Sequence, residues 1–173
     1  MANFKEDLVK VKAFIFDIDG VLSLQTISLN TFGVPNRTIN LRDGYALQLA
    51  VKRGYFVGVI SGGRPKEYQK RLKQLGITDV YLNSSTKMEY FNNFLKKHNL
   101  NKSDVLFMGD DIPDFEVMKQ AGVPVCPSDA DSEIKQIAAY ISDKKGGEGC
   151  VRDVIEQVMR LHNNWMDSDA YTW

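Results

Sequence analysis

The sequence predicts an α/β protein built on a doubly wound, Rossmann-like parallel sheet with helices on both faces. Short apolar runs alternate with amphipathic helical stretches, and this strand–helix–strand pattern repeats five times. Gly54, Gly76 and Gly122 each stand just past a predicted helix, where a left-handed C-cap is expected. Right-handed crossovers leave few ways to connect such a sheet. We expect a single capless domain over residues 1–162 and a C-terminal tail over 163–173.

The individual elements follow from periodicity along the chain. Short apolar runs indicate strands, and longer stretches with apolar residues three and four positions apart indicate helices. The strands are expected near 11–17, 55–60, 79–82, 104–108 and 123–126, with a weak sixth near 139–142. The helices are expected near 44–53, 65–75, 87–98, 112–121, 131–138 and 150–162. A helix therefore lies between each pair of consecutive strands, as parallel pairing requires.

Residues 23–42 break this pattern, because they separate the first strand from the first helix. Segments 26–29 and 38–41 alternate polar and apolar residues around the turn-forming segment 33–36, which predicts a β-hairpin. The hairpin starts at the end of the first strand. We therefore expect it to form a flap over any site located there.

Composition and charge exclude several classes of protein. Lys plus Arg equals Asp plus Glu, 22 against 22, and the basic residues are scattered, so we expect no nucleic-acid partner. No apolar stretch approaches the roughly 18 residues that span a bilayer, and the first residues lack the core of a signal peptide. Cys126 and Cys150 have no metal-ligand spacing. These features predict a reduced cytoplasmic protein with no membrane partner.

Asp17 and Asp19 form the most informative feature of the chain, in the segment Asp-Ile-Asp-Gly-Val that follows the apolar run 13–16. Alternation along a strand sends both side chains to one face. Such a pair can hold Mg²⁺ while one of its carboxylates does chemistry on a phosphate. Asp-rich turns are common and usually only solvated, so the interpretation depends on the other strand ends.

Three further strand ends carry side chains of matching chemistry. Ser61 follows the second strand, and Lys87 comes after the third. The fourth strand is followed by Asp110, Asp111 and Asp114. Ligands of doubly wound sheets bind beyond the carboxyl ends of the strands, so these side chains are expected at one site. Facing carboxylates would repel one another without a cation, which favours a bound Mg²⁺.

The order and spacing of these residues resemble the four motifs of the haloacid dehalogenase superfamily of phosphotransferases. The resemblance extends to the small capless 3-deoxy-D-manno-octulosonate 8-phosphate phosphatases, through the segments 40–45, 75–77, 109–111 and 146–152. It implies a Mg²⁺-dependent phosphoric monoester hydrolase that acts on a phosphorylated keto-sugar acid. In Gram-negative-type bacteria that reaction feeds lipopolysaccharide synthesis.

The resemblance also implies catalytic roles. Asp17 is expected to be the nucleophile that forms an aspartyl-phosphate. Asp19 is expected to protonate the leaving oxygen, to deprotonate the attacking water, and to turn its main-chain carbonyl to the metal. Mg²⁺ is expected to bridge Asp17, Asp110 and the phosphate, which Ser61 and Lys87 also bind.

The remaining expected site residues lie around this centre. Asp111 and Asp114 are expected to orient the water molecules of the metal or to cap a helix, and capping alone would also explain Asp43. By resemblance, the substrate-binding residues are Asp19, Asn40, Arg42, Asp43, Gly44, Arg71 and Lys87.

The resemblance implies a homotetramer in which a neighbouring subunit walls the pocket. Four apolar positions of the hairpin favour such an assembly because we expect them to be exposed. They are Ile27, Leu29, Ile39 and Leu41. The glycines of segment 146–149 provide backbone freedom for a mobile C-terminal portion that can reach an active site.

Three departures from the family pattern lie where the sugar would be recognised. Gly63 stands where the family usually carries arginine, Gln48 stands where it often carries another, and Ser-Leu-Gln at 23–25 replaces Ser/Thr-Asp-Gly. A nine-carbon sugar-acid 9-phosphate phosphatase, a broad sugar phosphatase and a catalytically silent assembly module therefore remain as alternatives. A signalling receiver domain is disfavoured, because its phosphoacceptor aspartate would end the third strand, where this chain has Asn83.

Overall fold

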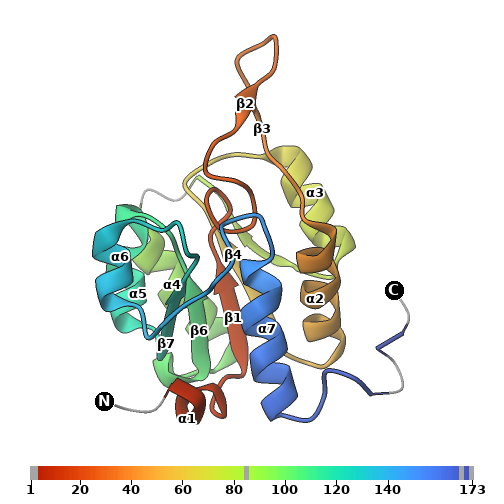
Figure 1. The fold of residues 1–173 in the computed structure, drawn as a ribbon, viewed down its shortest axis with the longest axis vertical. Helices are drawn as coiled ribbons and strands as arrows, with labels where there is room; N and C mark the ends of the chain where they lie inside the picture. Colours follow the sequence, from red (N-terminus) through yellow and green to blue (C-terminus); the bar gives the residue numbers. More distant parts are fainter. Residues whose placement is uncertain (1–3, 84–85, 168–169, 172–173) are drawn as a thin grey trace.

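The computed structural model describes residues 4–83, 86–167 and 170–171. Six strands form one sheet in the order β5-β4-β1-β6-β7-β8, and every neighbouring pair is parallel. The strands are β1 (Ala13–Phe16), β4 (Phe56–Ile60), β5 (Asp79–Tyr81), β6 (Val105–Met108), β7 (Val123–Cys126) and β8 (Tyr140–Ile141). β1 lies between β4 and β6, so the strand that carries the acidic pair is central (Figure 1).

The helices cover both faces of this sheet. They are α1 (Phe4–Leu8), α2 (Leu41–Lys52), α3 (Lys66–Gln74), α4 (Lys87–His98), α5 (Phe115–Gln120), α6 (Ser132–Ile137) and α7 (Cys150–Leu161). Two 3₁₀ turns, η1 (Lys102–Asp104) and η2 (Ile112–Asp114), precede β6 and α5. The predicted fold class is confirmed. The predicted helix at 112–121 divides into η2 and α5, and the sequence analysis did not predict α1.

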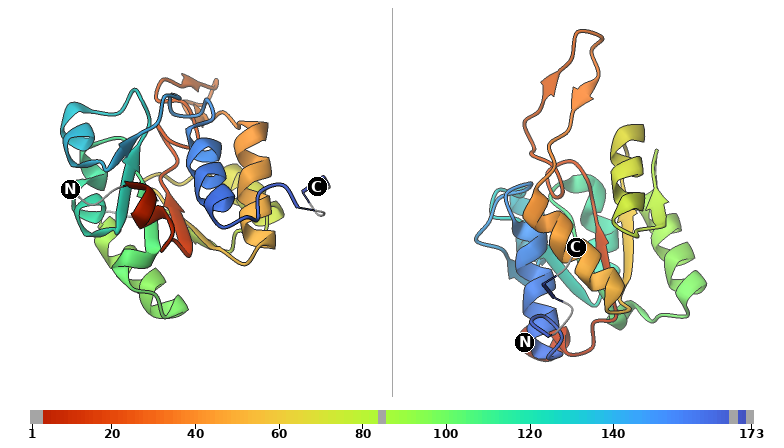
Figure 2. Two further views of the ribbon diagram at one scale, coloured as in Figure 1. Left: turned by 60° about the horizontal axis from the view of Figure 1, so that its bottom comes forward. Right: turned by 90° about the vertical axis from the view of Figure 1, so that its right-hand side faces the viewer.

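Two apolar clusters hold the layers together. Along β1, Phe14 and Phe16 face one cluster and Ala13 and Ile15 face the other, as strand alternation requires. The first cluster includes the buried faces of α2 and α7, and the second includes those of α4, α5 and α6. Figures 1 and 2 show α2 and α7 side by side on one face of the sheet. All four side chains of β1 are fully buried, so its carboxyl end is held firmly.

The glycines that follow helices serve two different purposes. Gly54 and Gly76 have φ angles of 83° and 85°, which confirms the left-handed caps predicted there. The same prediction for Gly122 is wrong, because α5 ends in extended backbone at Ala121. A Cβ on Gly122 would lie 2.5 Å from the Cα of Ser103, so glycine is needed there for close approach of two backbones.

The hairpin exists, but its second arm lies earlier than predicted. β2 (Ser28–Leu29) pairs antiparallel with β3 (Pro35–Asn36), so Pro35 and Asn36 lie in a strand instead of the turn. The Asn30 side chain accepts the backbone N–H groups of Phe32 and Val34 and so closes the turn before position 35. The predicted strand at 38–41 is wrong, because Asn40 caps α2 there. The hairpin projects from the carboxyl-end side of the sheet, well beyond the body (Figures 1 and 2).

Apolar side chains of the hairpin are exposed in the single chain. Phe32 is 89% exposed and Leu29 63%, whereas Ile27 is only partly exposed.

Trp165, beyond α7, is buried against the body, where it contacts the ring of Tyr45 edge-on and the guanidinium of Arg152. In the described part of the chain, no helix is both long and apolar enough to cross a membrane. The domain boundary at 162 stays a prediction.

Candidate active site

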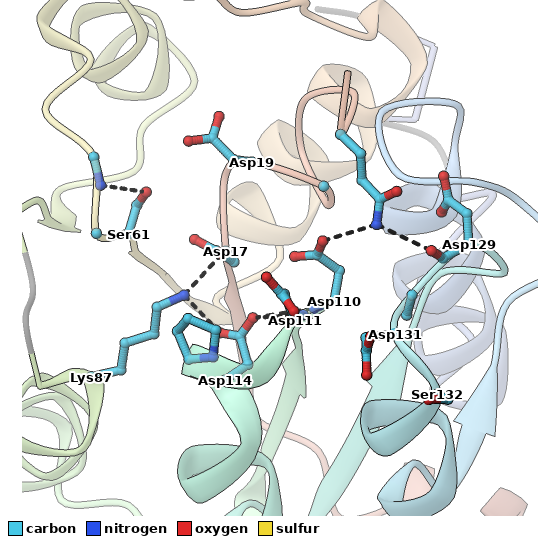
Figure 3. A pocket seen from close by; sticks show the side chains of 16 residues that line it. Asp17, Asp19, Ser61, Lys87, Asp110, Asp111, Asp114, Asp129, Asp131 and Ser132 are labelled. Atoms are coloured by element: carbon cyan, nitrogen blue, oxygen red, sulfur yellow. Dashed lines mark hydrogen bonds and ion pairs between the residues drawn. The ribbon is translucent and has the colours of Figure 1, made fainter. Parts of the chain in front are cut away.

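The centre of the site is a buried ion-pair triad. Asp17 follows β1 directly, and Lys87 is the first residue of α4. The Nζ atom of Lys87 lies 2.8 Å from Oδ2 of Asp17 and 2.7 Å from Oδ1 of Asp114 (Figure 3). All three side chains are buried. Burial opposes the positive charge of Lys87, but the two carboxylates raise its pKa above the ordinary value.

Asp114 organises the loop after β6. Its Oδ2 atom accepts the backbone N–H groups of Asp110 and Asp111, at 3.2 and 3.5 Å. Asp111 in turn caps η2 by accepting the N–H of Ile112, and together the two residues form a capping box. A Cβ on Gly109 would lie 2.4 Å from the Cβ of Asp114, so this turn requires glycine. The prediction that Asp111 and Asp114 have capping roles agrees with these contacts.

Asp17, Asp110 and Asp114 form a group of hard oxygen donors suited to a divalent cation. One carboxylate oxygen of each lies within 4.8 Å of the others. Burial, followed by the charge of Asp114, raises the pKa of Asp17 to about 7, although Lys87 opposes the shift. Burial also raises the pKa of Asp110 to about 7 against a hydrogen bond from Gln25. Without a cation the carboxyl groups of Asp17 and Asp110 resist ionisation, and Mg²⁺ would relieve that cost.

The raised pKa values predict an unusual pH dependence of stability. The native carboxyls of Asp17 and Asp110 have pKa values of about 7, against 3.8 as the ordinary value. Between these values the folded protein binds more protons than the unfolded chain, so stability falls as the pH rises. In EDTA we expect the free energy of unfolding to be lower at pH 8 than at pH 5.5, by more than about 1 kcal/mol. Urea denaturation at both pH values measures this, and Mg²⁺ should restore the loss at pH 8. Equal stability at both pH values would contradict the prediction.

Asp19 and Ser61 line the same cavity as the triad. The cavity has a volume of about 890 Å³, and its lining also includes Gly62 and Gly63 after β4. The Ser61 hydroxyl is buried and accepts the N–H of Gly63 at 3.3 Å. Asp19 points away from the triad (Figure 3), and both its oxygens accept hydrogen bonds from Arg37 of the hairpin. All the side chains predicted from the four strand ends thus line one cavity.

Several residues of this cavity were not predicted from the sequence. The Gln25 amide donates to Oδ2 of Asp110 at 3.2 Å and to the carbonyl of Asp129 at 3.1 Å. The loop between β7 and α6 adds Asp129 and Asp131 to the lining, and the first residue of α6 adds Ser132 (Figure 3). That loop follows the carboxyl end of β7, and ligands of doubly wound sheets bind beyond such strand ends. These residues could therefore have been predicted in the same way as Asp17, Ser61 and Asp110. Gln25 was noted only as a departure from the family pattern, and no pattern indicated that it would reach Asp110 or that Arg37 would reach Asp19. Both residues are positioned by the base of the hairpin.

Of the seven residues expected to bind the substrate, Asp19 and Lys87 line the candidate cavity, but Asn40, Arg42, Asp43, Gly44 and Arg71 do not. Asn40 caps α2 and donates to the carbonyl of Gly147 at 3.1 Å. Arg42 is exposed beside the N-terminal end of α7, and Arg71 lies near Gly44 under the first turn of α2. Their contact with a substrate stays a prediction, and it would need a second subunit or a movement of the chain.

Asp43 does not cap its own helix, and the structure corrects that interpretation. It is buried in the first turn of α2, and its Oδ1 atom accepts the N–H of Arg152 at 2.8 Å. Its Oδ2 atom has no hydrogen-bond partner in the described part of the chain. Burial raises the pKa of Asp43 to about 6, although the hydrogen bond from the backbone N–H of Arg152 lowers it. Asp43 therefore joins α2 to the start of α7.

The glycine-rich segment before α7 packs closely against the turn after β1. The N–H of Gly147 donates to the carbonyl of Val21, and the N–H of Gly146 donates to the Asp129 carboxylate. A Cβ on Gly146 would lie 1.9 Å from the carbonyl oxygen of Gly20. These contacts hold the segment against the turn that follows β1.

The fold and the site define a hydrolase of the haloacid dehalogenase type. The haloacid dehalogenase-like hydrolase family matches residues 73–155. The 3-deoxy-D-manno-octulosonate 8-phosphate phosphatase KdsC of Escherichia coli K12 is 33% identical over 149 residues, which cover 86% of this chain and 79% of that protein. The chain belongs to this family of phosphatases.

Two solved structures share the whole fold. The phosphatase of the same name from Yersinia pestis has a TM-score of 0.90 at 29% identity, covering 94% of this chain and 88% of that one. The Moraxella catarrhalis phosphatase, solved with a magnesium ion, a phosphate ion and a KDO molecule, has a TM-score of 0.90 at 28% identity. That alignment covers 95% of each chain.

Proposed function

We propose that this protein is a Mg²⁺-dependent phosphatase of 3-deoxy-D-manno-octulosonate 8-phosphate. The observation that carries the proposal is the buried pair of carboxylates, Asp17 and Asp110, which face one cavity beside the ammonium group of Lys87. Hydrolysis of a phosphate ester needs a nucleophile and positive charge near the phosphate. The carboxylate of Asp17 supplies the nucleophile, and the pair of carboxylates attracts a divalent cation. The Moraxella catarrhalis relative, solved with a magnesium ion and a KDO molecule, supports the choice of metal and sugar acid.

In the proposed reaction, a carboxylate oxygen of Asp17 attacks the phosphorus atom. The bond from phosphorus to the sugar oxygen breaks while Asp19 gives that oxygen a proton. Asp19 then takes a proton from a water molecule, which attacks the aspartyl-phosphate, releases inorganic phosphate and regenerates Asp17. Lys87 stabilises the charge of Asp17 and of the phosphate oxygens, at 2.8 Å from the carboxylate.

Asp17, Asp110 and the main-chain carbonyl of Asp19 would hold Mg²⁺, which would supply positive charge between nucleophile and phosphate. Asp114 has one oxygen on Lys87 and the other on two backbone N–H groups, so we assign it to positioning. The Ser61 hydroxyl faces the cavity from the end of β4, where it would bind a phosphate oxygen.

Gln25 would tune this metal site, because its amide holds the Asp110 carboxylate in place. Outer partners of metal ligands typically affect affinity by about 10- to 100-fold. We expect Gln25→Ala to raise the Mg²⁺ dissociation constant about tenfold, measured by calorimetry on the metal-free protein. Ser132→Ala, which removes a hydroxyl from the same cavity, serves as the matched control. Unchanged affinity in the Gln25 variant would remove Gln25 from the metal site.

Phosphate release with Mg²⁺ across a panel of sugar phosphates tests the proposed function. The panel contains octulosonate 8-phosphate, nine-carbon sugar-acid 9-phosphates and hexose phosphates, each with an EDTA control. We expect a strong preference for the eight-carbon acid and loss of activity in EDTA. Preference for a nine-carbon acid, equal activity on all members or no activity would each replace the proposal with one of the alternatives.

We also propose a cytoplasmic homotetramer assembled through the hairpins. Phe32 and Leu29 of the hairpin are apolar and largely exposed, and leaving such a patch in water is energetically unfavourable. A second copy of the chain would cover them and bring its arginines to the neighbouring cavity. Sedimentation equilibrium at micromolar concentration should show a tetramer, and Phe32→Asp should shift it to smaller species. A monomeric wild-type protein would contradict this assembly.

A further inference from the structure

Arg37 forms a two-pronged ion pair with Asp19. Its Nε atom lies 2.7 Å from Oδ1 and its Nη2 atom 2.8 Å from Oδ2 of the carboxylate. The Arg37 side chain is only 12% exposed, whereas that of Asp19 is 41% exposed. This bidentate geometry is the one in which arginine binds carboxylates most strongly. The hairpin thus places a guanidinium group directly on a residue of the catalytic cavity.

Gly63 leaves the space that this guanidinium occupies. A Cβ on Gly63 would lie 2.8 Å from Nη2 of Arg37 and 3.6 Å from Oδ2 of Asp19. Gly63 does not have the positive φ that would by itself require glycine. Its lack of a side chain therefore serves the placement of Arg37, and a methyl group at this position would displace the guanidinium.

The Arg37–Asp19 pair stands at the boundary between two cavities. Asp19 and Gly63 line the catalytic cavity, while Arg37 lines a second cavity of about 790 Å³ between the hairpin and the start of α3. That second cavity also includes Arg64 and Tyr68. A leaving group whose oxygen meets Asp19 therefore lies next to the guanidinium of Arg37.

We propose that Arg37 is a specificity-determining residue that exchanges the carboxylate of Asp19 for the carboxylate of the sugar acid. The proposal rests on the proposed function, in which Asp19 gives its proton to the leaving oxygen. A proton donor must lie within hydrogen-bond distance of that oxygen, so the guanidinium lies within about 6 Å of it. The exchange replaces one arginine–carboxylate pair by another and frees both oxygens of Asp19 for the reaction. A neutral leaving group cannot make this exchange.

The test compares Arg37→Ala, Arg37→Lys, Gly63→Ala and the double variant Arg37→Ala/Gly63→Ala. Each is assayed with octulosonate 8-phosphate, with a hexose 6-phosphate and with para-nitrophenyl phosphate. We expect Arg37→Ala to raise KM for the sugar-acid phosphate about tenfold or more, with KM for the two substrates that lack a carboxylate within about twofold of wild type. Arg37→Lys should recover little, because an ammonium group cannot form the fork. Binding of free octulosonate, measured by calorimetry, should weaken in parallel.

Gly63→Ala should reproduce the effect of Arg37→Ala, and the double variant should be no worse than Arg37→Ala alone. Arg64→Ala, an exposed arginine of the same second cavity, is the matched control and should change neither KM ratio. An equal loss on all three substrates, or an effect of Arg64→Ala as large as that of Arg37→Ala, would overturn the assignment of Arg37. Failure of the wild-type protein on all three substrates would instead overturn the proposed function.

Discussion

Asp17→Asn is expected to lower turnover by about 10⁴-fold or more, because an amide cannot form the acyl-phosphate bond. The fold should be retained, since asparagine has nearly the same shape as aspartate. Burial also makes the ionised form of Asp17 unfavourable, which raises its pKa to about 7, so removing the charge should not destabilise the protein. In EDTA at pH 8 the variant should be at least as stable as wild type. Phosphate release and urea denaturation, performed on the same preparation, measure the two effects.

Asp111→Asn is the control for this experiment. Asp111 lines the same cavity, but its side chain caps η2 instead of facing Lys87. Its replacement should leave activity within about tenfold of wild type and should change stability little, because asparagine caps helices about as well as aspartate. Near-normal activity of Asp17→Asn would move the nucleophile to another residue.

Lys87→Met is expected to destabilise the metal-free protein by about 3–5 kcal/mol, because it leaves two buried carboxylates without their common partner. Lys87 is 6% exposed, and it holds Asp17 at 2.8 Å and Asp114 at 2.7 Å. The loss should be larger at pH 8 than at pH 5.5, since protonation removes the unpaired charge at the lower pH. Urea denaturation in EDTA gives the free energies.

Lys97→Met provides the comparison for Lys87→Met. Lys97 also pairs with a buried aspartate, at 2.6 Å from Asp79, but its own side chain is 54% exposed. The penalty there should be about 1 kcal/mol or less, because water screens the pair. A similar penalty for both variants would mean that the Lys87 triad contributes no more to stability than a surface ion pair.

Local patterns were enough to predict the sheet and the catalytic strand ends. Apolar runs fixed β1, β4 and β6, and the alternation with helices implied parallel pairing, which brings the carboxyl ends together. Asp17, Ser61 and Lys87 therefore line one cavity as predicted. The roles assigned to these residues stay predictions.

Long-range contacts of irregular segments could not be predicted in this way. Alternation of polar and apolar residues predicted the second arm of the hairpin at 38–41, although Asn30 closes the turn earlier. With the arm misplaced, nothing indicated that Arg37 would reach Asp19. Gly63 was noted as a departure from the family, but only the structure shows that the guanidinium of Arg37 fills its space. Helix-capping patterns also assigned Asp43 to the wrong helix, because a partner 109 residues away in sequence leaves no local signal.

The position of α7 in the sequence has a consequence for how this protein is made. β1 is the first strand to be synthesised, yet Phe14 and Phe16 share a cluster with Val151, Val154 and other residues of α7, which follows all six strands. During translation, α2 can cover part of this face early, but the part that packs against α7 stays uncovered until α7 has emerged. The newly made chain exposes apolar surface throughout that interval, when aggregation is a hazard. Fragments that stop before residue 150 should accordingly bind chaperones instead of folding.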